Sequence, residues 1–126
     1  MDDLRVFVHV LAATVWVGGQ LVLGALVPTL RQLGPEAPRA AARAFSRIAW
    51  PAYVVLLVTG VWNVAATGAD DGRRTTLLLK LAAVAASGVT AYLHAQATTV
   101  RARAVFGALT TATAVLALLL GVLLSG

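Results

Sequence analysis

Three ionisable residues, His9, Lys80 and His94, fall inside long apolar runs of the sequence. Burying such groups in hydrocarbon is costly, so each position predicts a function or a specific partner. A histidine imidazole can ligate a metal or move a proton, and a lysine ammonium can bind an anionic group. Metal ligation and proton handling are therefore the chemistry that these residues indicate.

The apolar runs also place polar residues on shared helix faces. His9, Trp16 and Gln20 are spaced so that they fall within about 20° of one line on an α-helix that turns about 100° per residue. Lys80 and His94 lie on a similar stripe in a later run. Because lipid cannot satisfy polar groups, both stripes are expected to face the protein interior.

The composition excludes several other classes of function. The chain has 126 residues, of which 60% are hydrophobic and 12% are charged, whereas soluble domains contain about 25% charged residues. This balance excludes an ordinary soluble enzyme and a disordered chain. The absence of cysteine excludes disulfides and thiolate metal sites. The sequence also lacks a phosphate-binding loop and a carboxylate pair for hydrolytic chemistry.

Four apolar runs approach or exceed the length of about 20 residues that crosses a bilayer. The first opens with Asp2 and Asp3 instead of a basic segment, which argues against a cleaved signal peptide. Short gaps make successive helices antiparallel neighbours, with Asp70-Asp71-Gly72 as turn residues in the second gap. We therefore predict an all-α fold: a single domain, 1–126, forming an antiparallel four-helix transmembrane bundle. The expected spans are 4–30, 48–67, 76–97 and 104–124.

The first gap combines chain-breaking residues with a basic helix face. Gly34-Pro35 interrupts the chain, and Pro38 suits the first turn of a helix that begins before the membrane. Arg39, Arg43 and Arg47 follow at helical spacing, so they lie on one face. We expect this face to contact anionic lipid headgroups.

The distribution of basic residues predicts the orientation in the membrane. The first and third gaps together contain six arginines: Arg31, Arg39, Arg43, Arg47, Arg101 and Arg103. The other side has Arg5, Arg73 and Arg74, with Lys80 near it. Basic residues favour the cytoplasmic side, so both termini are expected outside the inner (plasma) membrane. Because the arginines border the spans, the net charge of +5 does not indicate a nucleic-acid partner.

Position along the spans predicts which candidates can meet. His9 and Lys80 each lie about one turn from the outer ends of their spans, and the second span brings Trp62 and Asn63 to that side. We therefore expect an outer site formed by His9, Trp16, Trp62, Asn63 and Lys80. Two simpler interpretations stay open: His9 as a hydrogen-bonded interfacial histidine, and Lys80 reaching the headgroups.

His94 is expected at the opposite depth. It lies 14 residues after Lys80, which corresponds to about 21 Å along an α-helix. This places it near the inner face with Arg47 and Trp50, as a structural residue or as part of a second polar site. His9 and His94 should therefore not bind the same metal ion.

The segment His9-Val-Leu-Ala-Ala-Thr-Val-Trp16-Val-Gly18-Gly19 resembles the first helix of CopD-type copper resistance membrane proteins. The resemblance continues through Phe45-Ser46-Arg47, Thr59-Gly60-Val61-Trp62-Asn63, and Leu77 to Leu81, covering most of the first three spans. It implies copper transport or homeostasis, with His9 as metal ligand and Asn63 as a weak donor. Trp16 and Trp62 would form walls, and Lys80 would tune the charge.

The available ligands limit what this resemblance implies. Copper(I) prefers thiolate and thioether ligands, whereas this chain has no cysteine and only one methionine. Copper(II) accepts imidazole, so His9 stays a candidate anchor. CopD-type proteins also usually contain this domain within a longer membrane protein.

A related pattern points to haem. A histidine in the first span, Trp50-Pro51, Thr59-Gly60-Val61-Trp62 and Lys80-Leu81 together resemble the HemJ family. That family binds haem b and supports oxidation of protoporphyrinogen, which would make His9 an axial ligand and Lys80 a partner for a propionate. A third alternative is an accessory membrane subunit without a cofactor. Small residues in every span permit self-association, and a homodimer is consistent with them.

Overall fold

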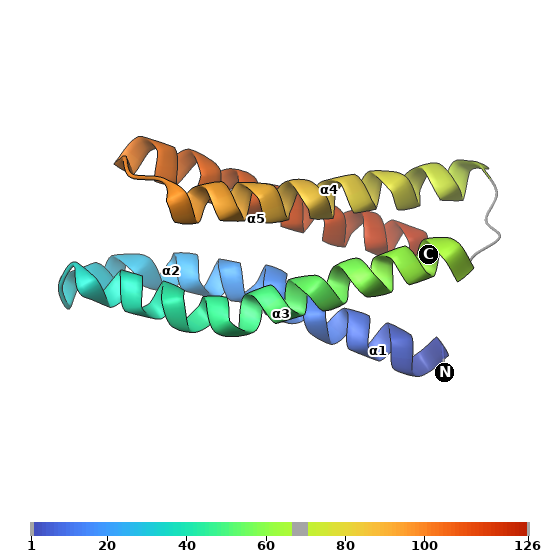
Figure 1. Cartoon of the computed structure of the whole chain (residues 1–126), viewed down its shortest axis with the longest axis horizontal. Helices are drawn as coiled ribbons and strands as arrows, with labels where there is room; N and C mark the ends of the chain where they lie inside the picture. The colour runs from blue at the N-terminus through green and yellow to red at the C-terminus, as the bar shows by residue number, and fades with distance from the viewer. Residues whose placement is uncertain (1, 67–70, 126) are drawn as a thin grey trace. The chain divides into compact units, whose positions relative to one another are not determined.

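The computed structural model describes residues 2–66 and 71–125, and this part of the chain contains helices and no strands. A π-helical turn, η1 (Thr14–Gly18), separates α1 (Asp2–Ala13) from α2 (Gly19–Gln32); Figure 1 labels the two helices. The remaining helices are α3 (Glu36–Ala66), α4 (Asp71–Gln96) and α5 (Val100–Ser125).

Four segments of the described chain are long and apolar enough to cross a membrane: Asp3–Gln32, Glu36–Ala65, Gly72–Gln96 and Val100–Leu123. The first combines α1, η1 and α2. The prediction of an all-α protein with four membrane-spanning helices is confirmed. Thr67 and Asp70, expected at the end of a span and in a turn, lie outside the described residues, whereas Asp71 and Gly72 already belong to α4.

Glycine and proline determine the turn between α2 and α3. Gly34 has a φ of 122°, a left-handed conformation that side chains with a Cβ rarely adopt. Its N–H donates to the Arg31 carbonyl over 3.2 Å and so closes the end of α2. The next helix begins at Glu36, with Pro38 in its first turn. The predicted start of this helix within the first gap, with Pro38 in its first turn, is confirmed.

The chain divides into two compact units, Met1–Leu56 and Leu57–Gly126. In the first unit, the buried residues come from both arms of the hairpin: Ala12, Trp16, Val17, Ala49, Tyr53 and Leu56. Apolar residues on the other side of α1, such as Val10 and Leu11, are more than half exposed, at 56% and 53%. Such apolar exposure suits contact with lipid chains rather than water.

The π-helical turn η1 was not predicted. At its first residue, the Thr14 hydroxyl donates to the Val10 carbonyl over 2.8 Å, a bond that competes with the backbone ladder and often bends helices. Within the turn, the adjacent residues Trp16 and Val17 are both buried, with exposed fractions of 4% and 7%. In a π-helix the i→i+5 bonds widen the helix, so the angular spacing assumed for His9, Trp16 and Gln20 does not hold across this turn.

Gly19 marks the closest approach within the first unit. A Cβ built on Gly19 would lie 2.6 Å from Cζ of Phe45, which belongs to α3. The aromatic ring therefore occupies the space that a side chain at position 19 would need. Without a hydrophobic driving force between helices in lipid, such close packing stabilises their association.

In the second unit, α4 and α5 lie side by side as an antiparallel pair (Figure 1). A buried pair of hydroxyls joins their middles: Ser87 Oγ donates to the Thr110 carbonyl over 2.9 Å, and Thr110 Oγ1 donates to the Ser87 carbonyl over 2.7 Å. Ser87 is 0% exposed. Interhelical bonds of this kind contribute about 0.6 kcal/mol on average in membranes.

The two adjacent glycines of the first span should respond differently to substitution. Gly19→Ala would place a methyl group on the Phe45 ring, so the free energy of unfolding should fall by about 1–3 kcal/mol. Gly18 is the matched control, because no atom lies within 4 Å of a Cβ built there. Thermal unfolding in mild detergent would compare the two variants. Equal losses in both would contradict the close contact at Gly19.

Candidate functional site

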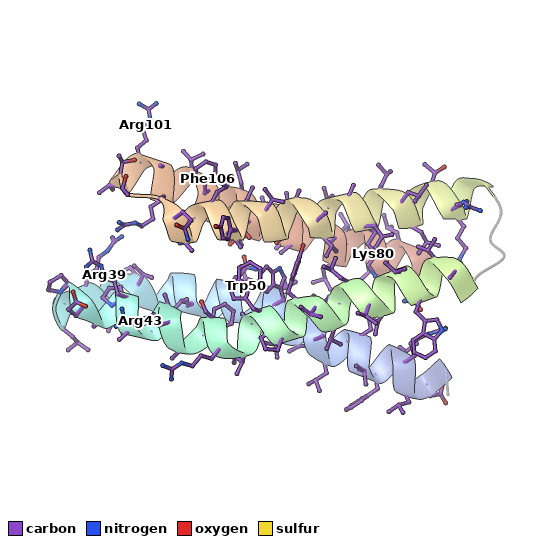
Figure 2. All side chains as sticks on the ribbon, in the orientation of Figure 1. Arg39, Arg43, Trp50, Lys80, Arg101 and Phe106 are labelled. Atoms are coloured by element: carbon purple, nitrogen blue, oxygen red, sulfur yellow. The ribbon has the colours of Figure 1, made fainter. Side chains whose placement is uncertain are left out.

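Trp16 belongs to a cluster of three aromatic side chains in the first unit. Its ring centroid lies 5.3 Å from that of Trp50 and 4.6 Å from that of Tyr53. Trp50 and Tyr53 meet edge to face with centroids 5.7 Å apart. These separations are typical of favourable aromatic pairs. Figure 2 labels Trp50 along the middle part of α3.

This cluster corrects the predicted depth of Trp16. The sequence placed Trp16 in the outer group and Trp50 in the inner group, but their rings are in contact. Trp16 lies 14 residues after Asp2, about 21 Å into the span and close to its midpoint. The prediction that separated these two tryptophans is therefore wrong. The prediction grouped Trp16 with His9 because the two residues share a helix face, although residues on one face can lie at different depths in the membrane.

His9 lies half-buried on α1. Phe7 and Val10 are 62% and 56% exposed, so the imidazole is turned away from the most lipid-exposed side of the helix. Arg5 is also half-buried and lies one turn before His9, which places the two side chains on the same helix face. The first unit thus has a cation and an imidazole near the beginning of its first span.

Trp62 and Asn63 lie in the last turns of α3, within the second unit. Trp62 is 52% exposed and Asn63 is half-buried. This exposure of Trp62 favours a membrane-interface tryptophan over the wall of an enclosed site. The meeting of these two residues with His9 in one outer site stays a prediction.

Lys80 lies half-buried on α4 against a glycine of α5. A Cβ built on Gly121 would lie 3.2 Å from the Lys80 Nζ and 3.5 Å from its Cε. Because Gly121 has no side chain, the end of the Lys80 side chain can pack directly against α5. Figure 2 shows Lys80 along the same helix pair. The sequence stripe correctly indicated an inward-facing position, and α5 is the neighbour that it faces.

His94 links the end of α4 to the beginning of α5. Its Nδ1 donates to the carbonyl of Arg103 over 2.7 Å, which requires the proton on that ring nitrogen. A Cβ built on Gly107 would lie 3.1 Å from both Cε1 and Nδ1 of the ring. The histidine therefore packs over a glycine and satisfies a backbone carbonyl near the start of α5. This favours the structural interpretation of His94.

Lys80 and His94 occupy equivalent positions along one helix pair. They are 14 residues apart on α4, and the glycines that they contact, Gly121 and Gly107, are 14 residues apart on α5. This match is what an antiparallel pair in constant register produces, and it corresponds to about 21 Å along each helix. The predicted separation in depth between Lys80 and His94 is therefore confirmed.

Arg47, the other member of the predicted second polar site, is exposed on α3 in the first unit. His94 belongs to the second unit, so their proximity stays a prediction. Across residues 2–66 and 71–125, no group of three or more His, Cys, Asp or Glu side chains is arranged to hold a metal ion.

Sequence reasoning missed Tyr53 and underestimated Trp50. Both fall on the face of α3 that also carries Phe45 and Ala49, at spacings of three or four residues. This helical periodicity could have identified the inward face of α3. The Ser87–Thr110 contact was also missed, because a threonine hydroxyl in a span can equally bond its own helix, as Thr113 does with the Leu109 carbonyl over 2.7 Å.

Comparison of the chain with known protein families, curated proteins and solved structures found no match.

Loss of the His94 side chain should loosen the α4–α5 turn. His94→Leu removes the donor to the Arg103 carbonyl, at a cost of about 1 kcal/mol, so amides near residues 97–103 should exchange hydrogen about fivefold faster. His94→Asn is the control because it retains a side-chain N–H donor. Unchanged exchange in His94→Leu would contradict the structural role.

The contact between Lys80 and Gly121 should appear as energetic coupling. Gly121→Leu fills the space beside the ammonium. It should therefore lower the free energy of unfolding by about 1 kcal/mol less in the Lys80→Ala background than in the natural chain. Thermal unfolding of the single and double variants in mild detergent measures this difference. Gly24→Leu is the control because no atom lies within 4 Å of a Cβ at that position. Full additivity of Gly121→Leu with Lys80→Ala would contradict the contact.

Proposed function

We propose that the protein is a multi-pass membrane protein that handles copper, with His9 as the residue that binds the ion in the first span. The observation that carries this proposal is the half-buried position of His9 on a helix whose neighbouring side chains are apolar and exposed. An ionisable residue in such a place is a functional candidate. Copper(II) accepts imidazole nitrogen as a ligand.

Two further features support His9 over His94. The π-helical turn η1 begins five residues after His9, and π turns inside α-helices are frequent at functional sites. His94, by contrast, donates one ring nitrogen to the Arg103 carbonyl and packs over Gly107. The resemblance to CopD-type proteins also begins at His9. In this proposal copper is the cargo, and Asn63 and Lys80 assist at the outer side.

We place the protein in the inner (plasma) membrane with both termini outside. The four apolar helices support a multi-pass membrane protein. The arginines of the first and third gaps support the orientation, since basic residues favour the cytoplasmic side.

Haem b is a second candidate, favoured by the position of Arg5. A cation one turn from His9 opposes binding of a bare metal ion but suits a porphyrin, whose carboxylates an arginine can bind through two hydrogen bonds. His9 would hold the iron, and Arg5 or Lys80 would orient a propionate. Bound haem would supply redox chemistry at its iron.

Copper and haem make different predictions for the purified protein. If copper is the cargo, protein loaded with copper and desalted should be colourless in the Soret region and retain the metal, while His9→Ala should retain only the background amount. If haem is the cofactor, the natural chain should show a Soret band that His9→Ala loses.

His94→Asn is the matched control because it removes the other histidine and keeps a donor for Arg103. It should leave copper or haem content unchanged. Equal copper in the natural chain and His9→Ala, without a Soret band in either, would contradict both candidates and support a cofactor-free subunit.

A further inference from the structure

We propose that the exposed arginines at the beginning of α3 bind the phosphates of anionic phospholipids, and that Arg43 and Arg47 do so while Arg39 does not. The proposal concerns a surface away from His9 and does not depend on the function of that residue. It rests on helix length, side-chain exposure and the pairing of charges in the first unit.

The length of α3 exceeds what a membrane crossing needs. The helix has 31 residues, or about 46 Å at 1.5 Å per residue, whereas the hydrocarbon core is about 30 Å thick. The segment from Ile48 to Ala66 has nearly the length of about 20 residues that is needed to cross this core. The segment from Glu36 to Arg47 therefore extends about 18 Å beyond it. A tilt of about 20°, the average for such helices, changes these depths by less than a tenth.

The three arginines occupy different depths along this extension. Arg47 directly precedes Ile48 and lies at the edge of the hydrocarbon, Arg43 lies about 6 Å farther out, and Arg39 about 12 Å farther out. The headgroup layer on one side of a bilayer is about 5–8 Å thick. Arg47 and Arg43 are therefore level with lipid phosphates, whereas Arg39 lies beyond them. Figure 2 shows Arg39 and Arg43 near the turn that joins α2 and α3.

Exposure and charge distinguish the same residues. All three arginines are exposed, and Phe45, which contacts the Gly19 position, marks the other side of the helix. Arg39 Nη1 lies 3.3 Å from Glu36 Oε1, so part of its charge is already balanced. Neither Arg43 nor Arg47 forms an ion pair with an acidic residue of the described chain.

Lipid phosphate fits this arrangement better than an acidic protein in the aqueous phase. A soluble partner would reach Arg39 first and would have to enter the headgroup layer to reach Arg47. Phosphate is already present at the level of Arg43 and Arg47, and arginine binds it through two parallel hydrogen bonds. Each arginine near an anionic surface contributes about 1 kcal/mol.

The test is a titration of the full-length protein in neutral detergent with phosphatidylglycerol, followed by native mass spectrometry, with phosphatidylcholine as the neutral comparison. The natural chain should bind phosphatidylglycerol preferentially, and added salt should weaken this preference. Arg43→Gln/Arg47→Gln should lower the apparent affinity by about thirtyfold, which is about 2 kcal/mol. Glutamine is a good helix former, so the fold should persist.

One matched variant decides the assignment. Arg39→Gln removes the outermost, paired arginine and should change the affinity by less than about threefold. Unchanged affinity in Arg43→Gln/Arg47→Gln would overturn the proposal. A loss in Arg39→Gln as large as in that double variant would also overturn it and favour an acidic partner in the aqueous phase.

Discussion

Close approach of side chains to glycine is the constraint on which both units of this protein depend. Lipid does not drive helices together as water does, so association requires dense packing and interhelical hydrogen bonds. Among the described residues, four side chains pack closely against a glycine of another helix: Phe45 at Gly19, Leu81 at Gly60, His94 at Gly107 and Lys80 at Gly121. Two of these four side chains are polar. The same glycines that permit packing therefore also provide positions for imidazole and ammonium groups inside the membrane.

Hydropathy alone was sufficient for the number and approximate limits of the spans, because the length of an apolar run directly reflects the thickness of the bilayer. The turn at Gly34 and the early start of α3 were also predictable, since glycine and proline act locally on the backbone. The grouping of Trp16 with the outer residues failed. It took the helix face that Trp16 shares with His9 as a guide to depth, whereas Trp16 lies near the middle of the span, in contact with Trp50.

The two histidines show why residue type and depth do not determine a role. His94 binds the carbonyl of Arg103, and a backbone carbonyl exists at every position and leaves no mark in the sequence. His9 shares its helix face with Arg5, and this pairing was visible in the spacing. The predicted depth therefore correctly separated His94 from Lys80, but only the structure identified the Arg103 carbonyl as the partner of His94. For Lys80, the sequence predicted an inward face without indicating that Gly121 makes room for the side chain.

The π-helical turn has a consequence for how the first span tolerates changes in length. A turn closed by i→i+5 bonds holds one residue more than an α-helical turn. The segment Thr14–Gly18 is thus equivalent to a single-residue insertion, absorbed without ending the helix. Deleting one of these residues would return the span to a plain α-helix, leaving the segments before and after it in nearly their present orientations.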